Sequence, residues 1–251
     1  MPKYEDLFGE TYLSHYARGN QTQVDPRIMV AAYAPNLDAT YGLYVNLLTP
    51  GSRVLDLGCG TGYILCWLSQ KPGLEPVGVD RSPSMVDAAR GYLPDLDIAL
   101  GDGLAYLRSH PAAFSAIFCH DVLEHLPTDE LCVDWVLAAR RALLPGGFFI
   151  CRVPNAANLT GSHMRYIDFT HRRSFTSFSL IQLLETASLT DCRIIPLRRQ
   201  AWWRRLHLKA VTLFHRAFYL FCGNRLERHF HKVIIGVGFN RGDAPKGNEA
   251  C

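Results

Sequence analysis

A short glycine-rich segment, DLGCGTG at residues 56–62, directly follows an apolar run of strand length. Glycines at such a point let the backbone turn sharply and approach a ligand closely. The next residue is Tyr63, so the segment lacks the last glycine of the dinucleotide-binding fingerprint. Asp80 ends a second apolar run, where an acid can accept hydrogen bonds from both hydroxyls of a ribose. These residues indicate a nucleoside-containing ligand, and the alternative is a packing turn followed by a solvated aspartate.

The elements that must position these residues alternate between apolar runs and helical patterns from residue 51 onward. Strands are expected at 53–57, 76–80, 97–100, 114–119, 148–153, 192–197 and 232–239. Helices are expected at 63–69, after Ser82, after Thr128 and at 176–189. Continuous apolar strands separated by helices are typical of a parallel sheet that is covered on both faces. The predicted fold class is therefore α/β, with a doubly wound, mostly parallel seven-stranded sheet.

The chain divides into five predicted parts. These are an N-terminal helical cap (1–50), a core (51–199), a basic helical insertion (200–231), the final core strand (232–240) and a flexible tail (241–251). A hydrophobic fraction of 48% with 20% charged residues excludes a disordered chain. The eight cysteines form no CxxC pair, which disfavours a zinc site or a disulfide framework. Without a signal-like N-terminus or a membrane-length apolar run, we expect a cytoplasmic location.

Five segments, taken together and in this order, resemble the motifs of class I S-adenosylmethionine-dependent methyltransferases. They are VLDLGCGTG at 54–62, VGVD at 77–80, GDG at 101–103, CHDVLEHL at 119–126 and LPGG at 144–147. The resemblance covers residues 53–197 and implies a Rossmann-like methyltransferase fold. In that family the seventh strand runs antiparallel and forms a hairpin with the sixth. The resemblance also implies S-adenosyl-L-methionine as the cofactor.

The resemblance implies cofactor contacts at the ends of the first four strands. The loop backbone would cradle the methionine part, the second strand would hold the ribose, and the third would meet the adenine. The loop contacts are assigned to Gly58, Cys59 and Gly60, and Asp56 would fix the loop and contact the ammonium group through water. Asp80 would hold the ribose, and the backbone of His120 would reach the methionine amino group. The residues expected near the adenine are Arg81, Met85, Asp102, Gly103 and Leu104. N-terminal aromatics close the site in this family, which makes Tyr4, Tyr12 and Tyr16 candidates.

The residues that follow the fourth strand should determine which kind of molecule accepts the methyl group. The chain has no Asn-Pro-Pro-aromatic run there, no Pro-Cys pair and a single glutamate, Glu124. These absences argue against nucleic bases and arginine as acceptors. The Glu-His pair instead resembles the small-molecule branch, which includes quinone and sugar O-methyltransferases. His125 is a candidate general base, because histidine titrates near neutral pH, and the alternative is a histidine that only orients the loop.

A second candidate site lies in the insert at residues 155–176. Its RYIDFTH run (165–171) resembles bacterial methyltransferases associated with surface-glycan synthesis. Asp168 and His171 are predicted to form a dyad in which the carboxylate orients the imidazole. A divalent metal bound by His163, Asp168 and His171 is the lesser alternative, because the spacing matches no strong metal motif. We therefore predict no metal, and a solvated loop remains the plain alternative.

A basic stretch near the C-terminus contrasts with the rest of the chain. Residues 191–232 carry ten basic and two acidic side chains, so this stretch contributes +8 to a net charge of +3. Within it, Trp202–Phe221 separates into an apolar and a basic side at helical spacing. Three interpretations stay open: packing on this chain or a second copy, an interfacial helix on an anionic membrane, and a nucleic-acid patch.

The leading hypothesis is an O-methyltransferase acting on a saccharide or lipid-linked glycan at the cytoplasmic face of the inner membrane. The alternatives are O-methylation of a quinone-like or other small metabolite, and an RNA-associated cofactor-binding protein. Nucleic acid is the less favoured partner, and the sequence does not predict an oligomeric state.

Overall fold

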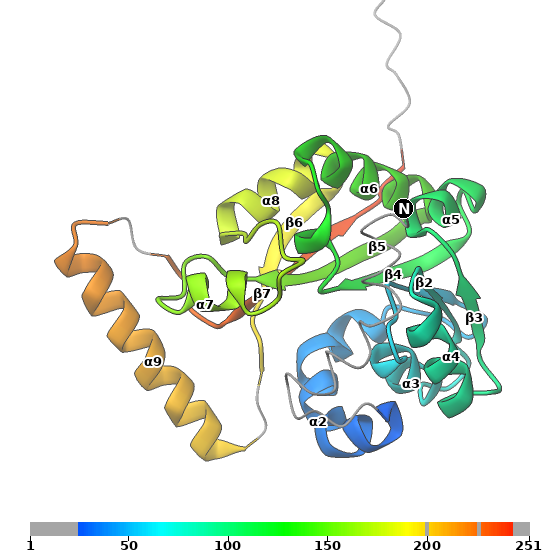
Figure 1. Ribbon diagram of the computed structural model, residues 1–251, viewed down its shortest axis with the longest axis horizontal. Coiled ribbons are helices and arrows are strands. Elements are labelled where there is room, and N and C mark those ends of the chain that lie inside the picture. The colour runs from blue at the N-terminus through cyan, green and yellow to red at the C-terminus, as the bar shows by residue number, and fades with distance from the viewer. Residues whose placement is uncertain (1–24, 199–200, 225–226, 243–251) are drawn as a thin grey trace, which may run out of the picture.

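The computed structural model describes residues 25–198, 201–224 and 227–242, so Tyr4, Tyr12 and Tyr16 lie outside the described residues. A seven-stranded sheet in the order β3-β2-β1-β4-β5-β7-β6 forms the centre of the fold (Figure 1). The antiparallel strand β7 pairs with both β5 and β6, and the remaining neighbours are parallel. The strands are β1 (Arg53–Leu57), β2 (Glu75–Asp80), β3 (Asp97–Leu100), β4 (Phe114–His120), β5 (Leu143–Pro154), β6 (Thr190–Ile195) and β7 (Val233–Phe239). This confirms the predicted fold class.

Helices cover both faces of the sheet (Figure 1). One face carries α2 (Pro26–Val45), α3 (Tyr63–Ser69) and α4 (Pro83–Tyr92), and the other carries α5 (Gly103–Ser109), α6 (Asp129–Ala142) and α8 (Ser177–Thr186). Strand residues alternate between the two resulting cores, as Val54 and Leu55 do on β1. Both are fully buried, which explains why the strands have continuous apolar sequences.

Two strands have a boundary that differs from the expected one by two residues or more. The strand predicted at 148–153 begins earlier, at Leu143, because α6 ends at Ala142 and Leu143 already pairs with Phe114 of β4. The strand predicted at 192–197 lies at 190–195. The Gly146 amide donates to the carbonyl of Asn240, which holds the Pro-Gly-Gly segment inside β5. The helix α6 therefore ends before the Pro-Gly-Gly segment, and its last turn leads directly into the strand.

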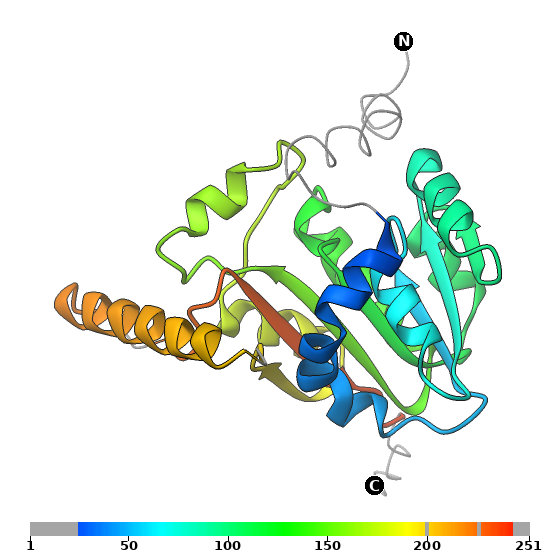
Figure 2. The ribbon, with the colours of Figure 1, turned by 90° about the horizontal axis from the view of Figure 1, so that it is seen from below.

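Two further helices project from the carboxyl edge of the sheet, where β1, β2 and β4 also end (Figure 2). They are α7 (Gly161–Tyr166), which follows β5, and α9 (Trp202–Phe221), which lies between β6 and β7. Both insertions therefore emerge at the same edge of the sheet as the glycine-rich loop and the end of β4. Among the described helices, none has the length and apolar character needed to cross a bilayer.

Candidate functional site

The glycine-rich loop after β1 has a backbone that requires glycine. Gly58 and Gly60 have φ values of 78° and 53°, where L-residues with a side chain are strained. A Cβ atom on Gly58 would lie 2.4 Å from Cγ2 of Val122, which follows β4, whereas a Cβ on Gly60 would meet nothing within 4 Å. The loop is therefore packed against the end of β4 on one side and open on the other.

Two aspartates hold this loop. Oδ2 of the buried Asp56 accepts from the amide of Leu65 at 3.0 Å, and burial raises the pKa of Asp56 to about 7. Asp80 accepts from the amides of Gly60 at 2.9 Å and Ser82 at 2.8 Å, and burial raises its pKa as well. The structure thus gives both residues a loop-fixing role. Each carboxylate oxygen can accept a second hydrogen bond, so the ribose contact of Asp80 stays a prediction.

The residues assigned to the adenine side lie around the ends of β2 and β3. Asp102 is exposed, and its Oδ1 caps α5 by accepting from the amide of Ala105 at 2.8 Å. A Cβ on Gly103 would come within 2.7 Å of the Trp135 ring, so this glycine is needed for packing. Cys59, in the glycine-rich loop, is buried; of the other residues on the adenine side, Leu104 is half-buried, Met85 is buried and Arg81 is exposed. Their contacts with adenine stay predictions.

The end of β4 offers polar atoms that lack a partner. Both ring nitrogens of the buried His120 have no hydrogen-bond partner in the described part of the chain. Burial lowers the pKa of His120 to about 3, and its neutral ring lies 5.3 Å from the Tyr41 ring, centroid to centroid. Unsatisfied buried polar atoms are costly. With the open side of the glycine loop and the acceptor oxygens of Asp80, these atoms fit a ligand that carries a ribose and an amino-acid group.

The turn after β4 is held by an ion pair that the sequence did not indicate. Asp121 has a φ of 54°, and its carboxylate pairs with the guanidinium of Arg152 on β5. A left-handed aspartate persists only when its surroundings hold it. The ion pair supplies that restraint and fixes the start of the segment that carries Glu124 and His125.

The predicted catalytic histidines, His125 and His171, come together although they are far apart in sequence. Their rings lie 4.7 Å apart, centroid to centroid, in an edge-to-face arrangement. Backbone bonds join the two segments, because the amide of Arg172 donates to the carbonyl of Glu124 at 2.7 Å. The guanidinium of Arg173 also donates to the carbonyl of Leu126 at 3.0 Å. The insert after β5 therefore closes over the turn after β4.

The prediction that Asp168 orients His171 is wrong, because the hydrogen bonds of these two residues lead to other partners. Oδ1 of Asp168 accepts from the hydroxyl of Thr170 at 2.6 Å and from the Thr170 amide at 2.8 Å. Oγ1 of Thr170 lies 2.8 Å from Nδ1 of His125. Nδ1 of His171 instead lies 2.9 Å from the carbonyl oxygen of Met164. Asp168 thus acts on His125 through Thr170, a residue that the sequence argument missed.

These bonds determine the tautomers of both histidines. Because the single Thr170 hydroxyl proton is donated to Asp168, Oγ1 can only accept from His125, whose Nδ1 must carry the proton. A carbonyl oxygen also only accepts, so Nδ1 of His171 is protonated too. In the neutral rings, Nε2 of each histidine is the acceptor. Burial, together with nearby His171, lowers the pKa of His125 to about 4, which keeps it neutral at pH 7.

A buried carboxyl group completes this cluster. Glu124 is 1% exposed, its Oε2 has no partner in the described part of the chain, and burial holds its pKa well above the usual range. Ligand atoms of Glu124, His125 and His171 lie within 4.8 Å of one another, so this group could hold a metal ion. The metal set considered from the sequence is wrong, since His163 and Asp168 are not part of such a group among the described residues.

Comparisons with known proteins show which families and folds this chain is similar to. Residues 54–147 match the family described as methyltransferase domain. The ubiquinone biosynthesis O-methyltransferase of Azoarcus sp. (strain BH72) is 35% identical over 101 residues, which cover 39% of this chain and 42% of that protein. The protein of the same name from Xanthomonas campestris pv. campestris (strain B100) is 28% identical over 178 residues, covering 65% and 73%. The chain spans less than half the length of the first two curated relatives that it matches.

Solved structures show the same fold at low identity. A SAM-dependent methyltransferase from Archaeoglobus fulgidus superposes with a TM-score of 0.61 at 19% identity, covering 81% of this chain and 92% of that one. The phosphoethanolamine N-methyltransferase 2 of Haemonchus contortus, in complex with S-adenosyl-L-methionine, has a TM-score of 0.59 at 18% identity, covering 84% and 53%.

Proposed function

We propose that this chain is a class I S-adenosylmethionine-dependent methyltransferase that methylates a hydroxyl oxygen of a small molecule; its fold and the match of residues 54–147 to a methyltransferase domain support the family assignment. The observation that carries the proposal is the hydrogen-bond chain from Asp168 through Thr170 to His125. It presents a neutral imidazole nitrogen at the carboxyl edge of the sheet, where an acceptor hydroxyl would need a base.

The residues assigned to the cofactor would act mainly by holding and orienting it. S-adenosylmethionine supplies, when bound, a methyl group that its sulfonium charge already activates. The Gly58–Gly60 backbone would hold the amino-acid part, and the partnerless nitrogens of His120 would hydrogen-bond to polar groups of the same ligand. Asp80 would accept from the ribose hydroxyls while its existing bonds keep the loop closed.

His125 would accept the acceptor's proton on Nε2. A hydroxyl loses its proton as its oxygen forms the new bond to carbon, so a base within hydrogen-bond reach lowers the barrier. The nearby Asp168 carboxylate, acting through Thr170, would stabilise the imidazolium ion that forms. Two hydrogen bonds from Thr170 lower the pKa of Asp168 although partial burial raises it, so the carboxylate stays ionised.

A quinone-like acceptor is the better supported small molecule. The relatives from Azoarcus and Xanthomonas carry the name ubiquinone biosynthesis O-methyltransferase. The saccharide or lipid-linked glycan acceptor, which the RYIDFTH run suggested, has no support from the comparisons. An RNA-associated cofactor-binding protein would not need the His125 relay, and it becomes the conclusion only if the protein binds S-adenosylmethionine without methylating small hydroxyl compounds.

The test is turnover with a dihydroxybenzene that carries an alkyl chain, followed by release of S-adenosylhomocysteine. His125→Gln should lower kcat by about 10²–10⁴ with little change in the Kd for S-adenosylhomocysteine. His171→Gln is the matched control, because it alters the neighbouring ring, whose Nδ1 lies against the carbonyl of Met164 and outside the bonds that join Asp168, Thr170 and His125. Equal turnover by the His125→Gln variant and the wild type would refute His125 as the base.

A further inference from the structure

The mechanism leaves α9 without a role. Its inner side is tied to the insert after β5, since Nε2 of His215 accepts from the amide of Leu159 at 3.0 Å. The hydroxyl of Tyr219 donates to the carbonyl of Ala157 at 2.9 Å, and both rings pack on Phe230. Beyond these contacts the helix extends outward from the body of the protein (Figures 1 and 2). It is therefore anchored to the acceptor side of the site.

One side of α9 is apolar and exposed. We call this side the outer arc, and its main residues are Trp202, Trp203, Leu206, Leu213, Phe214 and Phe221. Leu213 is 71% exposed and Phe221 is 89% exposed. The expectation that this face packs on its own chain is wrong for the described residues. Contiguous apolar surface of this kind marks a contact with a partner or with lipid.

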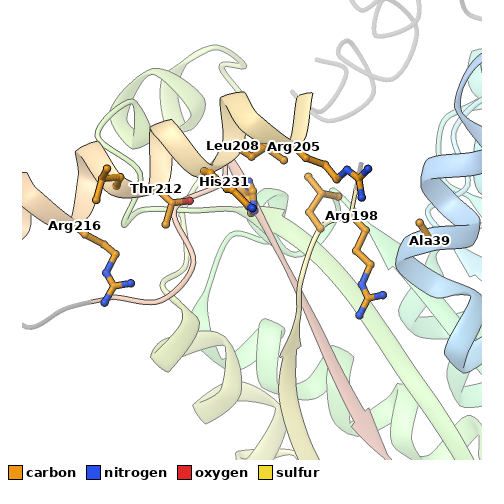
Figure 3. Close-up of a pocket in the computed structure, with 10 residues that line it drawn as sticks. Ala39, Arg198, Arg205, Leu208, Thr212, Arg216 and His231 are labelled. Atoms are coloured by element: carbon orange, nitrogen blue, oxygen red, sulfur yellow. The ribbon is translucent and has the colours of Figure 1, made fainter. Parts of the chain in front are cut away.

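A basic stripe borders the outer arc along one edge. Arg205, Lys209 and Arg216 lie on this stripe and, together with Arg198, line a groove of about 730 Å³ between α9 and the body (Figure 3). No acidic residue is among those that line the groove. None of these four cations forms an ion pair with a described residue. The stripe therefore carries positive charge that nothing within the described chain balances.

We propose that the outer arc and the basic stripe of α9 together bind the surface of a membrane rich in anionic phospholipids. With the outer arc in the interface, the stripe at its edge lies at the level of the headgroup phosphates. Tryptophans and basic residues beside an apolar face suit that boundary. This proposal goes beyond methyl transfer and does not depend on it.

Other partners would complement either the outer arc or the basic stripe, and not both. A nucleic acid would neutralise the stripe but would leave the outer arc in water. A second copy packed through the outer arc would cover it but would bring two basic stripes close together, which costs electrostatic energy. Tyr166, Ile167 and Phe169, at the end of α7 and just after it, are also exposed, and α7 lies at the same end of the molecule as α9 (Figure 2).

Co-sedimentation of the full chain with vesicles tests the proposal. Phosphatidylcholine vesicles should bind weakly, and binding should rise as phosphatidylglycerol replaces phosphatidylcholine. Changing Arg205, Lys209 and Arg216 to Gln should lower the partition coefficient about a hundredfold at low salt, at about fivefold for each cation. The loss should shrink as salt rises, because ions screen the charges. Arg141→Gln, on the exposed side of α6, is the control.

The apolar contribution needs its own variant. Changing Phe214 and Phe221 to Ala should lower partitioning about tenfold or more at every salt concentration, because the loss is apolar area. Leu43→Ala, at an exposed position of α2, is the matched control and should bind like the wild type. Circular dichroism of each variant verifies that the fold is intact.

Three outcomes would overturn the proposal. The wild type could ignore anionic vesicles at low salt. It could sediment as a dimer that the Phe214 and Phe221 changes dissociate, which would assign the outer arc to a second copy. It could also bind RNA tightly while vesicles fail to compete, which would assign the stripe to nucleic acid.

Discussion

Replacing Thr170 by Val should slow methyl transfer without touching the cofactor loop. Valine keeps the β-branched shape and removes only the hydroxyl, which donates to Asp168 at 2.6 Å and accepts from His125 at 2.8 Å. Without that acceptor, the hydrogen bond to Thr170 no longer favours a proton on Nδ1, and the tautomer with a proton on Nε2 can form. A hydrogen bond of about 1–2 kcal/mol then no longer favours the active tautomer, so kcat should fall about 5- to 30-fold.

The assay is steady-state release of S-adenosylhomocysteine, with the Kd for S-adenosylhomocysteine measured by calorimetry. The effect should appear in kcat, and the Kd should not change. Thr170→Ser restores the hydroxyl and should recover most of the rate. If Thr170→Val turns over like the wild type, or if Thr170→Ser is as slow as Thr170→Val, the relay from Asp168 to His125 does not operate.

Three other predictions test neighbouring parts of the site. Asp80→Asn should weaken binding of S-adenosylhomocysteine about tenfold or more in calorimetry, whereas Asp87→Asn on the exposed side of α4 should not; an unchanged affinity would remove Asp80 from the site. If His125 is the base, it works unprotonated, so kcat/KM should stay flat from pH 7 down to about pH 5 and fall toward its pKa of about 4; a decline that begins near pH 7 would contradict this assignment. Dialysis against EDTA should leave turnover unchanged, and a loss that added divalent metal restores would mean that Glu124, His125 and His171 hold a metal ion instead.

The sequence was sufficient to predict the sheet and the cofactor loop, because these features depend on local patterns. Apolar runs determine the strands, and the positive φ values of Gly58 and Gly60 are what the glycine-rich turn predicts. The role of the exposed outer arc of α9 was harder to predict, since helical spacing identifies an apolar face and does not determine what covers it.

The acceptor side could be predicted only in part, because it depends on contacts between distant segments. The three-residue separation of Asp168 and His171 suggested a direct dyad. The structure shows that the Asp168 carboxylate accepts hydrogen bonds from the amide and hydroxyl of Thr170. These bonds form a local turn with the residue two positions further along the chain. The Asp-x-Thr pattern was the available signal for that turn. Its link to His125 arises from tertiary packing between segments 45 residues apart.

The most direct test of the central claim is the fate of a labelled methyl group. The purified chain is incubated with S-adenosylmethionine carrying an isotopic label on its methyl group and with the alkylated dihydroxybenzene, and the product is analysed by mass spectrometry and NMR. The account predicts a labelled methyl ether on a ring oxygen, formed by the wild type and the His171→Gln variant and strongly reduced in His125→Gln. A label on carbon or nitrogen, or a label transferred equally by the His125→Gln variant, would contradict it.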